Sequence, residues 1–355
     1  MKKIFLTMSV FGVMLMLIPA ISLITSKNFD KEEIKKTPSY GDIIPTIQEN
    51  ISSDGETVTT KNNQEETVVL KEKEPYKVLD ITTDEVMTVS VRDYLIGAVA
   101  AEMPSSFQEE ALKAQAVAAH TYAERRRLLG EQPDLKGAYF SNDSSKYQAF
   151  FTESQMKQYF GETFESRYER IAKCVDEVLE IIITYNNEPI IAAFHSMSSG
   201  KTESAANVWG GDITYLIPVE SESDKTAPKY QQDYTFSIEE LKKNFEEYSK
   251  DIKLNENPAK VEDWFEIVQK TASQTIVKIK VGEVELKGSD VRAILGLRSS
   301  AFDIFLSNNI FTITTYGYGH GVGMSQFGAN SLALDGKTYD EILLHYYPGT
   351  KLEKV

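Results

Sequence analysis

The apolar and polar positions divide the chain into three parts. Residues 4–26 are almost continuously apolar and contain no charged side chain. Residues 27–75 carry scattered apolar side chains that follow neither the period of a helix nor that of a strand. From about Tyr76 to the end, periodic apolar runs alternate with turn residues, as is typical of a folded body. The pattern therefore predicts one globular region, residues 76–355, behind a hydrophobic segment and a polar connection.

The hydrophobic segment predicts a short cytoplasmic tip and a membrane anchor within residues 1–26. Its 23 uncharged residues would span roughly 35 Å as a helix, against about 30 Å for the hydrocarbon core of a bilayer. Lys2 and Lys3 precede it, which places the amino end in the cytoplasm and the rest of the chain outside. A cleaved signal peptide begins in the same way, but its apolar core is only about 7–15 residues long. We expect an uncleaved, single-pass anchor followed by a flexible stalk at residues 27–75, whose composition buries too little apolar surface to fold.

Helices and strands are both expected in the folded body. Apolar residues at helical spacing predict a helix over residues 91–103, with Ser90 as its N-cap. A capping-box match at residues 106–109 predicts a second, Ala-rich helix that reaches about Leu129. The other expected elements are strands at 78–81, 86–89, 265–268, 276–281, 284–286, 302–305 and 310–314, a hairpin at 179–195, helices at 164–178 and 237–248, and short helices capped by Ser289 and Thr338. This mixture, without a regular βαβ rhythm, indicates an α+β body formed as one domain or as two lobes around a cleft.

Composition narrows the possible functions. With 38 Lys and Arg against 53 Asp and Glu, the net charge is −15 and no basic block is present, so nucleic-acid binding is not expected. The single cysteine, Cys174, can form neither an intramolecular disulfide nor a Cys-rich zinc site, and its apolar helical surroundings predict a buried thiol. The four histidines show no HExxH pattern, so we expect no catalytic metal and no cofactor.

The first segment with candidate chemistry is the end of the 91–103 helix. Glu102 stands there among small apolar residues, directly before Met103 and Pro104. The simpler interpretation is a partly exposed glutamate at a helix end. The alternative is a carboxyl group whose pKa is raised by desolvation, so that it stays protonated and acts as a general acid. Lys113, on the next helix, could pair with such a carboxylate or with acidic groups of a substrate, or be an ordinary surface lysine.

The second segment is the largely polar stretch at residues 194–203. Ser198 and Lys201 have the spacing of penicillin-binding serine enzymes, but the companion motifs are missing from the sequence. The glycine, lysine and threonine in this stretch resemble the end of a phosphate-binding loop, but His195 stands where the first glycine is required. What remains is a polar loop after a strand, whose hydroxyl groups, that of Ser199 included, could bind sugar.

The third segment, residues 316–329, is rich in glycine. Five glycines alternate with aromatic and polar residues, which permits positive φ angles and close backbone approach. The simpler interpretation is a structural loop that enters a helix near Ser325, because the glycine spacing does not fit a dinucleotide-binding fingerprint. His320 lies between two glycines, so we expect it to face a ligand rather than a packed core.

Taken in order, these segments resemble the stage II sporulation protein D family. The resemblance covers the chain from about Tyr76 to the end, and the hydrophobic segment matches in kind rather than in sequence. The matching strings are EMP at residues 102–104, EALKAQAVAA at 110–119, HSMSSGKTES at 195–204, LGLRSSAF at 295–302, GYGHGVGMSQFGA at 317–329 and the tail at 339–350.

The resemblance implies a lytic transglycosylase that acts on septal peptidoglycan during engulfment of a forespore. Such an enzyme cleaves the MurNAc–GlcNAc linkage of glycan strands whose stem peptides have been removed, and it leaves a 1,6-anhydro sugar end. The resemblance implies Glu102 as the only catalytic acid and base, because a hydroxyl of the sugar replaces the water that a hydrolase activates with a second carboxylate. The expected substrate-binding residues are Lys113, His195, Ser198, Ser199, His320, Ser325 and Gln326.

The chain departs from the family at two points. His120 occupies a position that is commonly arginine, so a role that requires a permanent charge or a bidentate contact is not carried over. Some relatives hold a zinc ion with Cys and His after the second helix. This chain has no cysteine between Ala101 and Lys173, so no zinc is expected there.

The resemblance also implies partners and a location. The glycan strands are the expected substrate, and an amidase, an endopeptidase and a membrane anchor protein of the engulfment complex are the expected protein partners. The folded body is expected outside the cell membrane, between mother cell and forespore. Two other functions stay open: a non-catalytic, glycan-binding activator of an amidase, and a membrane-tethered scaffold for partner hydrolases.

Overall fold

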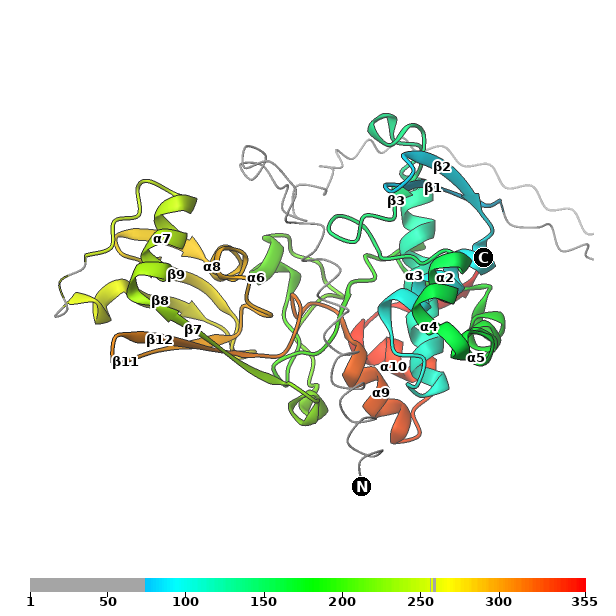
Figure 1. Cartoon of the computed structure of the whole chain (residues 1–355). Coiled ribbons are helices and arrows are strands. Elements are labelled where there is room, and N and C mark those ends of the chain that lie inside the picture. Colours follow the sequence, from blue (N-terminus) through cyan, green and yellow to red (C-terminus); the bar gives the residue numbers. More distant parts are fainter. Residues whose placement is uncertain (1–73, 256, 258–259) are drawn as a thin grey trace, which may run out of the picture. The chain divides into compact units, whose positions relative to one another are not determined.

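The computed structural model describes residues 74–355, apart from residues 256 and 258–259 (Figure 1). The expected anchor and all but the end of the expected stalk lie outside the described residues. Within the part of the chain that is described, no helix is both long and apolar enough to cross a membrane. The described residues form a mixed α+β fold with several small sheets, which confirms the predicted fold class.

Helix α2 (Val91–Glu102) forms where the apolar pattern predicts a helix. Ser90 is its N-cap, and the side-chain oxygen of Ser90 accepts a hydrogen bond from the backbone N–H of Asp93 at 3.1 Å. The backbone becomes extended at Met103, and Pro104 follows. Because the helix stops there, its last residue is the glutamate that the sequence marks as a candidate acid.

Helix α3 (Glu109–Leu128) begins later than the capping-box match predicts. Ser106 does not cap it, because the N–H of Phe107 donates to the carbonyl of Pro104 at 2.9 Å and holds these residues in a tight turn. The N-cap is Gln108, whose side chain makes no capping hydrogen bond. The turn before the helix, rather than a local cap, therefore decides where α3 starts.

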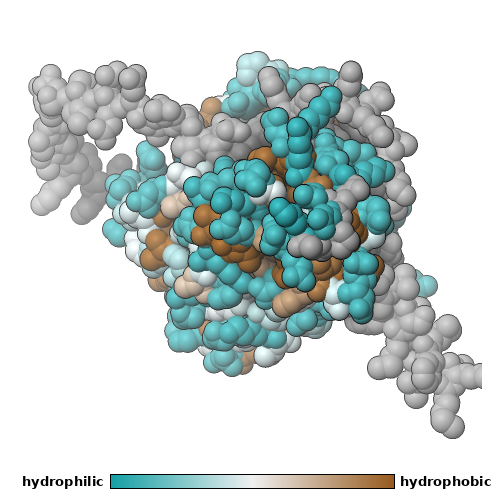
Figure 2. All heavy atoms as spheres, turned by 90° about the vertical axis from the view of Figure 1, so that its left-hand side faces the viewer, coloured by the Kyte–Doolittle hydropathy of each residue, from teal (hydrophilic) through white to brown (hydrophobic). Residues whose placement is uncertain are grey.

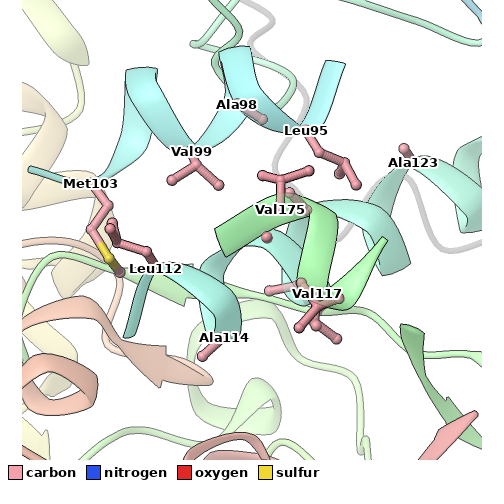
Figure 3. Packing of buried hydrophobic residues seen from close by; sticks show 14 of the residues in the cluster. Leu95, Ala98, Val99, Met103, Leu112, Ala114, Val117, Ala123 and Val175 are labelled. Atoms are coloured by element: carbon pink, nitrogen blue, oxygen red, sulfur yellow. The ribbon is translucent and has the colours of Figure 1, made fainter. Parts of the chain in front are cut away.

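Helix α3 passes through the largest hydrophobic core. The elements that pack against it are α2, β4 (Ile181–Tyr185), α5 (Phe164–Val178), α9 (Gln326–Leu334) and α10 (Tyr339–Tyr346). Its many alanines permit close approach on several sides, which is why the helix shows no single apolar stripe. Figure 3 shows Leu95 and Val99 of α2 and Val175 of α5 directed into this core.

Two small sheets contribute to the same core. Strand β1 (Tyr76–Asp80) lies between β2 (Glu85–Val89), which is antiparallel to it, and β3 (Phe140–Ser141), which is parallel. Strand β4 lies between β5 (Glu188–Pro189) and β14 (Lys351–Lys354), and it is antiparallel to both. Strand β14, the last in the sequence, is thereby paired with a strand from the middle of the chain.

A second hydrophobic core is formed by two antiparallel three-stranded sheets, of order β10-β9-β8 and β11-β12-β7, together with helices α7 and α8. Trp264 stacks on Phe311 in this core, with ring centroids 5.7 Å apart. Figure 2 looks onto this side of the molecule and shows apolar patches separated by hydrophilic residues. The elements are β7 (Gln231–Ser237), α7 (Ile238–Tyr248), β8 (Phe265–Lys270), β9 (Ile276–Val281), β10 (Val284–Lys287), α8 (Gly288–Leu295), β11 (Phe302–Ser307) and β12 (Ile310–Tyr316).

The start of α8 differs from the sequence prediction. Its N-cap is Lys287, so Ser289 lies inside the helix instead of capping it. A Cβ atom at Gly288 would lie 2.0 Å from the carbonyl oxygen of Ile276, so only glycine allows the helix to begin this close to β9. The remaining short elements are α4 (Glu153–Phe160), β6 (Phe194–His195), α6 (Ala205–Trp209), β13 (Met324–Ser325), and 3₁₀ turns at Pro133–Leu135, Gly161–Thr163, Glu222–Thr226 and Glu262–Trp264.

Candidate active site

The three segments with candidate chemistry lie together in the fold. Strand β6 pairs in parallel with β13, so the second segment runs beside the third. An isolated bridge joins Met197 to Tyr318 and continues this contact. Gln326, the first residue after β13, reaches the backbone of Glu102 at the end of α2. Residues far apart in the sequence thus converge at the candidate acid.

Glu102 has the electrostatic surroundings of an acid/base group. Its carboxylate is partly buried, and Oε1 accepts a hydrogen bond from the backbone N–H of Ala149 at 3.1 Å. Burial raises the pKa of Glu102 from its ordinary 4.5 to about 7, although the hydrogen bond from Ala149 acts in the opposite direction. Near neutral pH both the acid and the carboxylate are populated, as a group that must give and then accept a proton requires.

Gln326 holds the carboxyl end of α2. Its Nε2 donates to the backbone carbonyl of Glu102 at 3.1 Å and lies 3.3 Å from Oε1 of Gln115 on α3. The last carbonyls of a helix lack partners within the helix, so this side chain satisfies a group that would otherwise stay unpaired. Gln326 therefore positions the backbone of the candidate acid. A contact between Gln326 and substrate stays a prediction.

Two buried amide groups near Glu102 have no hydrogen-bond partner among the described residues: Nε2 of Gln115 and Nε2 of Gln148. Oε1 of Gln148 accepts a hydrogen bond from the hydroxyl of Tyr94 at 3.3 Å, so the group of Gln148 without a partner is its NH₂ donor. Gln148 directly precedes Ala149, which binds the Glu102 carboxylate. Unpaired buried donors are rare because they cost free energy, so these two amides are candidates for contact with a ligand or with water.

The loop that carries Ala149 is seated on a glycine of α2. The N–H of Phe151 donates to the carbonyl of Gly97 at 3.1 Å. A Cβ atom at Gly97 would lie 2.2 Å from the carbonyl oxygen of Phe151 and 2.5 Å from the ring of Phe150. Only glycine permits the loop to lie this close to the helix, so Gly97 fixes the place of the N–H group that binds Glu102.

We predict that Gly97→Ala lowers both stability and activity. The added methyl group must displace Phe150 and Phe151, which we expect to cost about 1–3 kcal/mol in the free energy of unfolding, although alanine is the better helix former by about 1 kcal/mol. Displacement of the loop also removes the hydrogen bond to Glu102. Urea denaturation and a glycan-cleavage assay measure the two effects. An unchanged variant in both assays would show that the loop adapts without moving Ala149.

A buried carboxylate that no pattern in the sequence indicates joins the second segment to the third. Oδ2 of Asp224 accepts hydrogen bonds from the N–H of Ser198 at 2.7 Å and from its hydroxyl at 2.6 Å. Oδ1 of Asp224 accepts from the hydroxyl of Ser325 at 2.8 Å. Burial raises the pKa of Asp224, although these hydrogen bonds oppose the shift. In this structure the hydroxyls of Ser198 and Ser325 bind within the protein, and their contact with substrate stays a prediction.

The two candidate histidines lie side by side. The rings of His195 and His320 have centroids 5.7 Å apart, and Trp209 lies 5.3 Å from His320. Nδ1 of His320 accepts a hydrogen bond from the N–H of Val322 at 3.0 Å. Burial lowers the pKa of His195 to about 4 and that of His320 to about 3, so both are neutral near pH 7. His320 is packed more closely than its flanking glycines predict.

Lys113 and Ser199 have partners away from Glu102. The ammonium group of Lys113 lies 2.7 Å from Glu110 and 2.5 Å from Glu177. Burial lowers the pKa of Lys113, but the hydrogen bonds to these two carboxylates outweigh it, and the net shift is upward. The hydroxyl of Ser199 donates to the carbonyl of Ser273. Contact of either residue with substrate stays a prediction.

Other groups singled out in the sequence are structural. Cys174 is buried, which confirms that prediction, and burial raises the pKa of its thiol to about 11. His120 is fully buried, with Nδ1 3.0 Å from the carbonyl oxygen of Ile181. Within the described ranges, no group of three or more His, Cys, Asp or Glu side chains could hold a metal ion.

Comparisons with known proteins bear on the same segments. A family model described as Stage II sporulation protein matches residues 80–185, which include Glu102, Gln115 and Ala149. A protein named Stage II sporulation protein D from Bacillus subtilis (strain 168) is 32% identical over 355 residues, covering 100% of this chain and 96% of the relative. Its namesake from Bacillus amyloliquefaciens is 36% identical over 269 residues, which is 76% of each chain.

A more distant relative has a different name. The protein named Amidase enhancer from Bacillus subtilis (strain 168) is 28% identical over 306 residues, covering 73% of this chain but 40% of that protein. The alignment with the first relative, by contrast, runs over this whole chain and nearly all of the other. The chain therefore belongs to the stage II sporulation protein D family.

Proposed function

We propose that this protein is a peptidoglycan lytic transglycosylase that acts in cell-wall remodelling during sporulation, with Glu102 as its single acid/base. Membership of the stage II sporulation protein D family supports the role in sporulation. The observation that carries the chemistry is the partly buried carboxyl of Glu102, whose pKa is raised to about 7. A carboxyl of ordinary pKa would be almost fully ionised near neutral pH and would be a poor proton donor.

The proposed reaction needs one carboxyl group. Protonated Glu102 donates its proton to the oxygen of the MurNAc–GlcNAc linkage, and the bond between C1 of MurNAc and that oxygen breaks. The oxygen leaves as the C4 hydroxyl of GlcNAc. The C6 hydroxyl of MurNAc then attacks C1, and its proton passes to the Glu102 carboxylate. The products are a 1,6-anhydro end and a regenerated acid, without consumption of water. A hydrolase would instead need a second carboxylate for water.

The neighbours of Glu102 support this cycle. The Ala149 N–H at 3.1 Å stabilises the carboxylate that forms after the first proton transfer. Gln326 holds the backbone of the acid, so the carboxyl group starts from a defined position.

The test is the chemical identity of the product. The full-length protein is incubated with glycan strands stripped of stem peptides, and the fragments are analysed by mass spectrometry. Fragments with 1,6-anhydro ends from wild type, but not from Glu102→Gln, are the expected result. Fragments that carry an added water would identify a hydrolase and overturn the proposal. Intact strands after incubation with wild type, under conditions where the protein binds them, would also overturn it.

The relative named Amidase enhancer supports a second candidate function. In that alternative the protein binds glycan without cutting it and raises the activity of a cell-wall amidase. Adding Glu102→Gln to an amidase assay separates the two functions. Undiminished stimulation of the amidase by this variant, with no cleavage by wild type, would favour the activator. Either function implies that the folded body lies outside the cell membrane, where the wall is, and this location is part of the proposal.

A further inference from the structure

A pocket of about 220 Å³ lies at the other end of α2 from Glu102. Three aromatic residues, Phe150, Phe151 and Tyr168, form part of its wall. The polar residues Asp93, Thr152 and Glu153 line the same pocket. Ligand pockets for drug-sized molecules are usually about 300–1,000 Å³, so this one is of a size for a single ring or side chain.

The pocket and the candidate acid share one continuous loop. Ala149 binds the Glu102 carboxylate, and Phe151 binds the carbonyl of Gly97, one to two turns earlier in α2. The loop then continues to Thr152, Glu153 and helix α4, which packs against α2 and α5 (Figure 1). At 1.5 Å per residue, the nine residues from Asp93 to Glu102 span roughly 13 Å. A polymer bound at the acid would have to cover about this distance to reach the pocket.

The lining favours an uncharged polar ring over a cation. Aromatic faces bury the apolar face of a ring, and the surrounding oxygens accept hydrogen bonds from hydroxyl groups. The carboxylates are already engaged: Asp93 accepts from the hydroxyl of Ser90 at 2.7 Å, and Glu153 lies 2.5 Å from Lys157. A cation would have to compete with these partners. A sugar hydroxyl can add to them, because a carboxylate accepts more than one hydrogen bond.

We propose that this pocket is a distal subsite that holds a sugar ring of the glycan strand while another part of the strand lies at Glu102. The inference rests on the proposed function, because it takes the glycan as the polymer bound at the acid. Tyr168 also borders a wider, open depression of about 520 Å³ that includes Arg92 and Lys173. A glycan chain could therefore continue past the pocket. Such a subsite makes the affinity depend on strand length.

The test uses Tyr168 because this pocket residue belongs to α5 and not to the loop that binds Glu102. Tyr168→Ala is introduced into full-length Glu102→Gln, and calorimetry measures binding of long peptide-free strands and of a GlcNAc–MurNAc disaccharide. We expect Tyr168→Ala to weaken binding of long strands roughly tenfold more than binding of the disaccharide. Tyr168→Phe keeps the ring and should retain most of the long-strand affinity. Tyr248→Ala, an exposed tyrosine on α7, is the matched control.

Two outcomes overturn the subsite. Equal weakening of long and short ligands means that the variant damages the protein or the site at Glu102, and equal affinity with and without the ring means that the pocket holds no sugar. The readout is binding by an inactive variant, so it does not depend on cleavage. If wild type gives no 1,6-anhydro product while long-strand binding still depends on Tyr168, the transglycosylase fails and the subsite stands.

Discussion

Glu102→Gln is expected to make the folded protein more stable at alkaline pH while it removes activity. Burial raises the pKa of Glu102 from 4.5 to about 7, so the folded state binds a proton more tightly than the unfolded state does. Wild-type stability therefore falls as pH rises from about 4.5 to 7, as the group loses that proton. Glutamine does not ionise, so the variant avoids this loss of stability. Its side-chain oxygen can still accept a hydrogen bond from the N–H of Ala149.

The size of this effect follows from the shift. The difference between 4.5 and about 7 corresponds to about 3 kcal/mol in the free energy of unfolding, reached above pH 7 and absent below pH 4.5. Urea denaturation of wild type and variant at pH 4, 6 and 8 measures it. Glu109→Gln is the control, because hydrogen bonding to Lys173 lowers the pKa of Glu109, so its replacement should bring no alkaline gain. A pH-independent difference for Glu102→Gln would mean that the carboxyl is solvated in the folded protein.

For the proposed transglycosylase, the same shift sets the pH dependence of cleavage. Cleavage should fall as pH rises through about 7, because the protonated acid is lost. Removal of a general acid typically lowers a rate by about 10²–10⁴-fold. A variant that gains stability and loses activity would identify Glu102 as a group kept for chemistry, since a residue kept for folding would show the opposite result.

Asp224→Ala is expected to be strongly destabilising. The carboxylate accepts three hydrogen bonds from Ser198 and Ser325, and the variant leaves these donors unpaired in a buried place. Each unsatisfied buried group costs about 1–3 kcal/mol, so we expect a loss of about 3–5 kcal/mol in the free energy of unfolding. Asp224→Asn keeps one acceptor oxygen and should lose less.

The control for this prediction lies on the same turn. Glu222 is exposed and pairs with Lys225 at 2.8 Å, a surface ion pair worth about 0–1 kcal/mol, so Glu222→Ala should change stability little. Equilibrium urea denaturation compares the three variants. If Asp224→Ala were as mild as Glu222→Ala, the junction between the second and third segments would not depend on the buried carboxylate.

Local signals in the sequence were sufficient for several elements. Ser237 and Glu240 form the predicted capping box of α7, and the Glu341 side chain accepts from the N–H of Thr338 before α10. These caps are exposed and depend only on residues three positions apart. The match at residues 106–109 failed because the turn at Pro104 is a competing local structure, and the cap at Ser289 failed because β9 lies against the start of α8.

Some residues of the candidate site could likewise be predicted from local sequence, and others could not. The place of Glu102 at the end of an apolar helix could be read from the sequence, but its raised pKa could not, because the burial that raises it depends on segments that only the fold brings together. Gln115 could also have been noticed, because a glutamine on a helix of alanines needs a partner when that helix is buried. The role of Asp224 could not be predicted, because the residues beside it in the sequence are charged and polar and give the pattern of a surface turn. Its role appears only when distant segments meet.

The hydrogen bond from Gln326 to Glu102 has a consequence for synthesis of the protein. The two residues are 224 positions apart, and Gln326 stands 29 residues before the end of the chain. A ribosome therefore makes the acid well before it makes the side chain that supports it. Any chain cut short before α9 would still contain Glu102, but the carbonyl of that residue would lack its partner. A product that ends before α9 would therefore carry the glutamate without this support, so the candidate site can be completed only after α9 has been made.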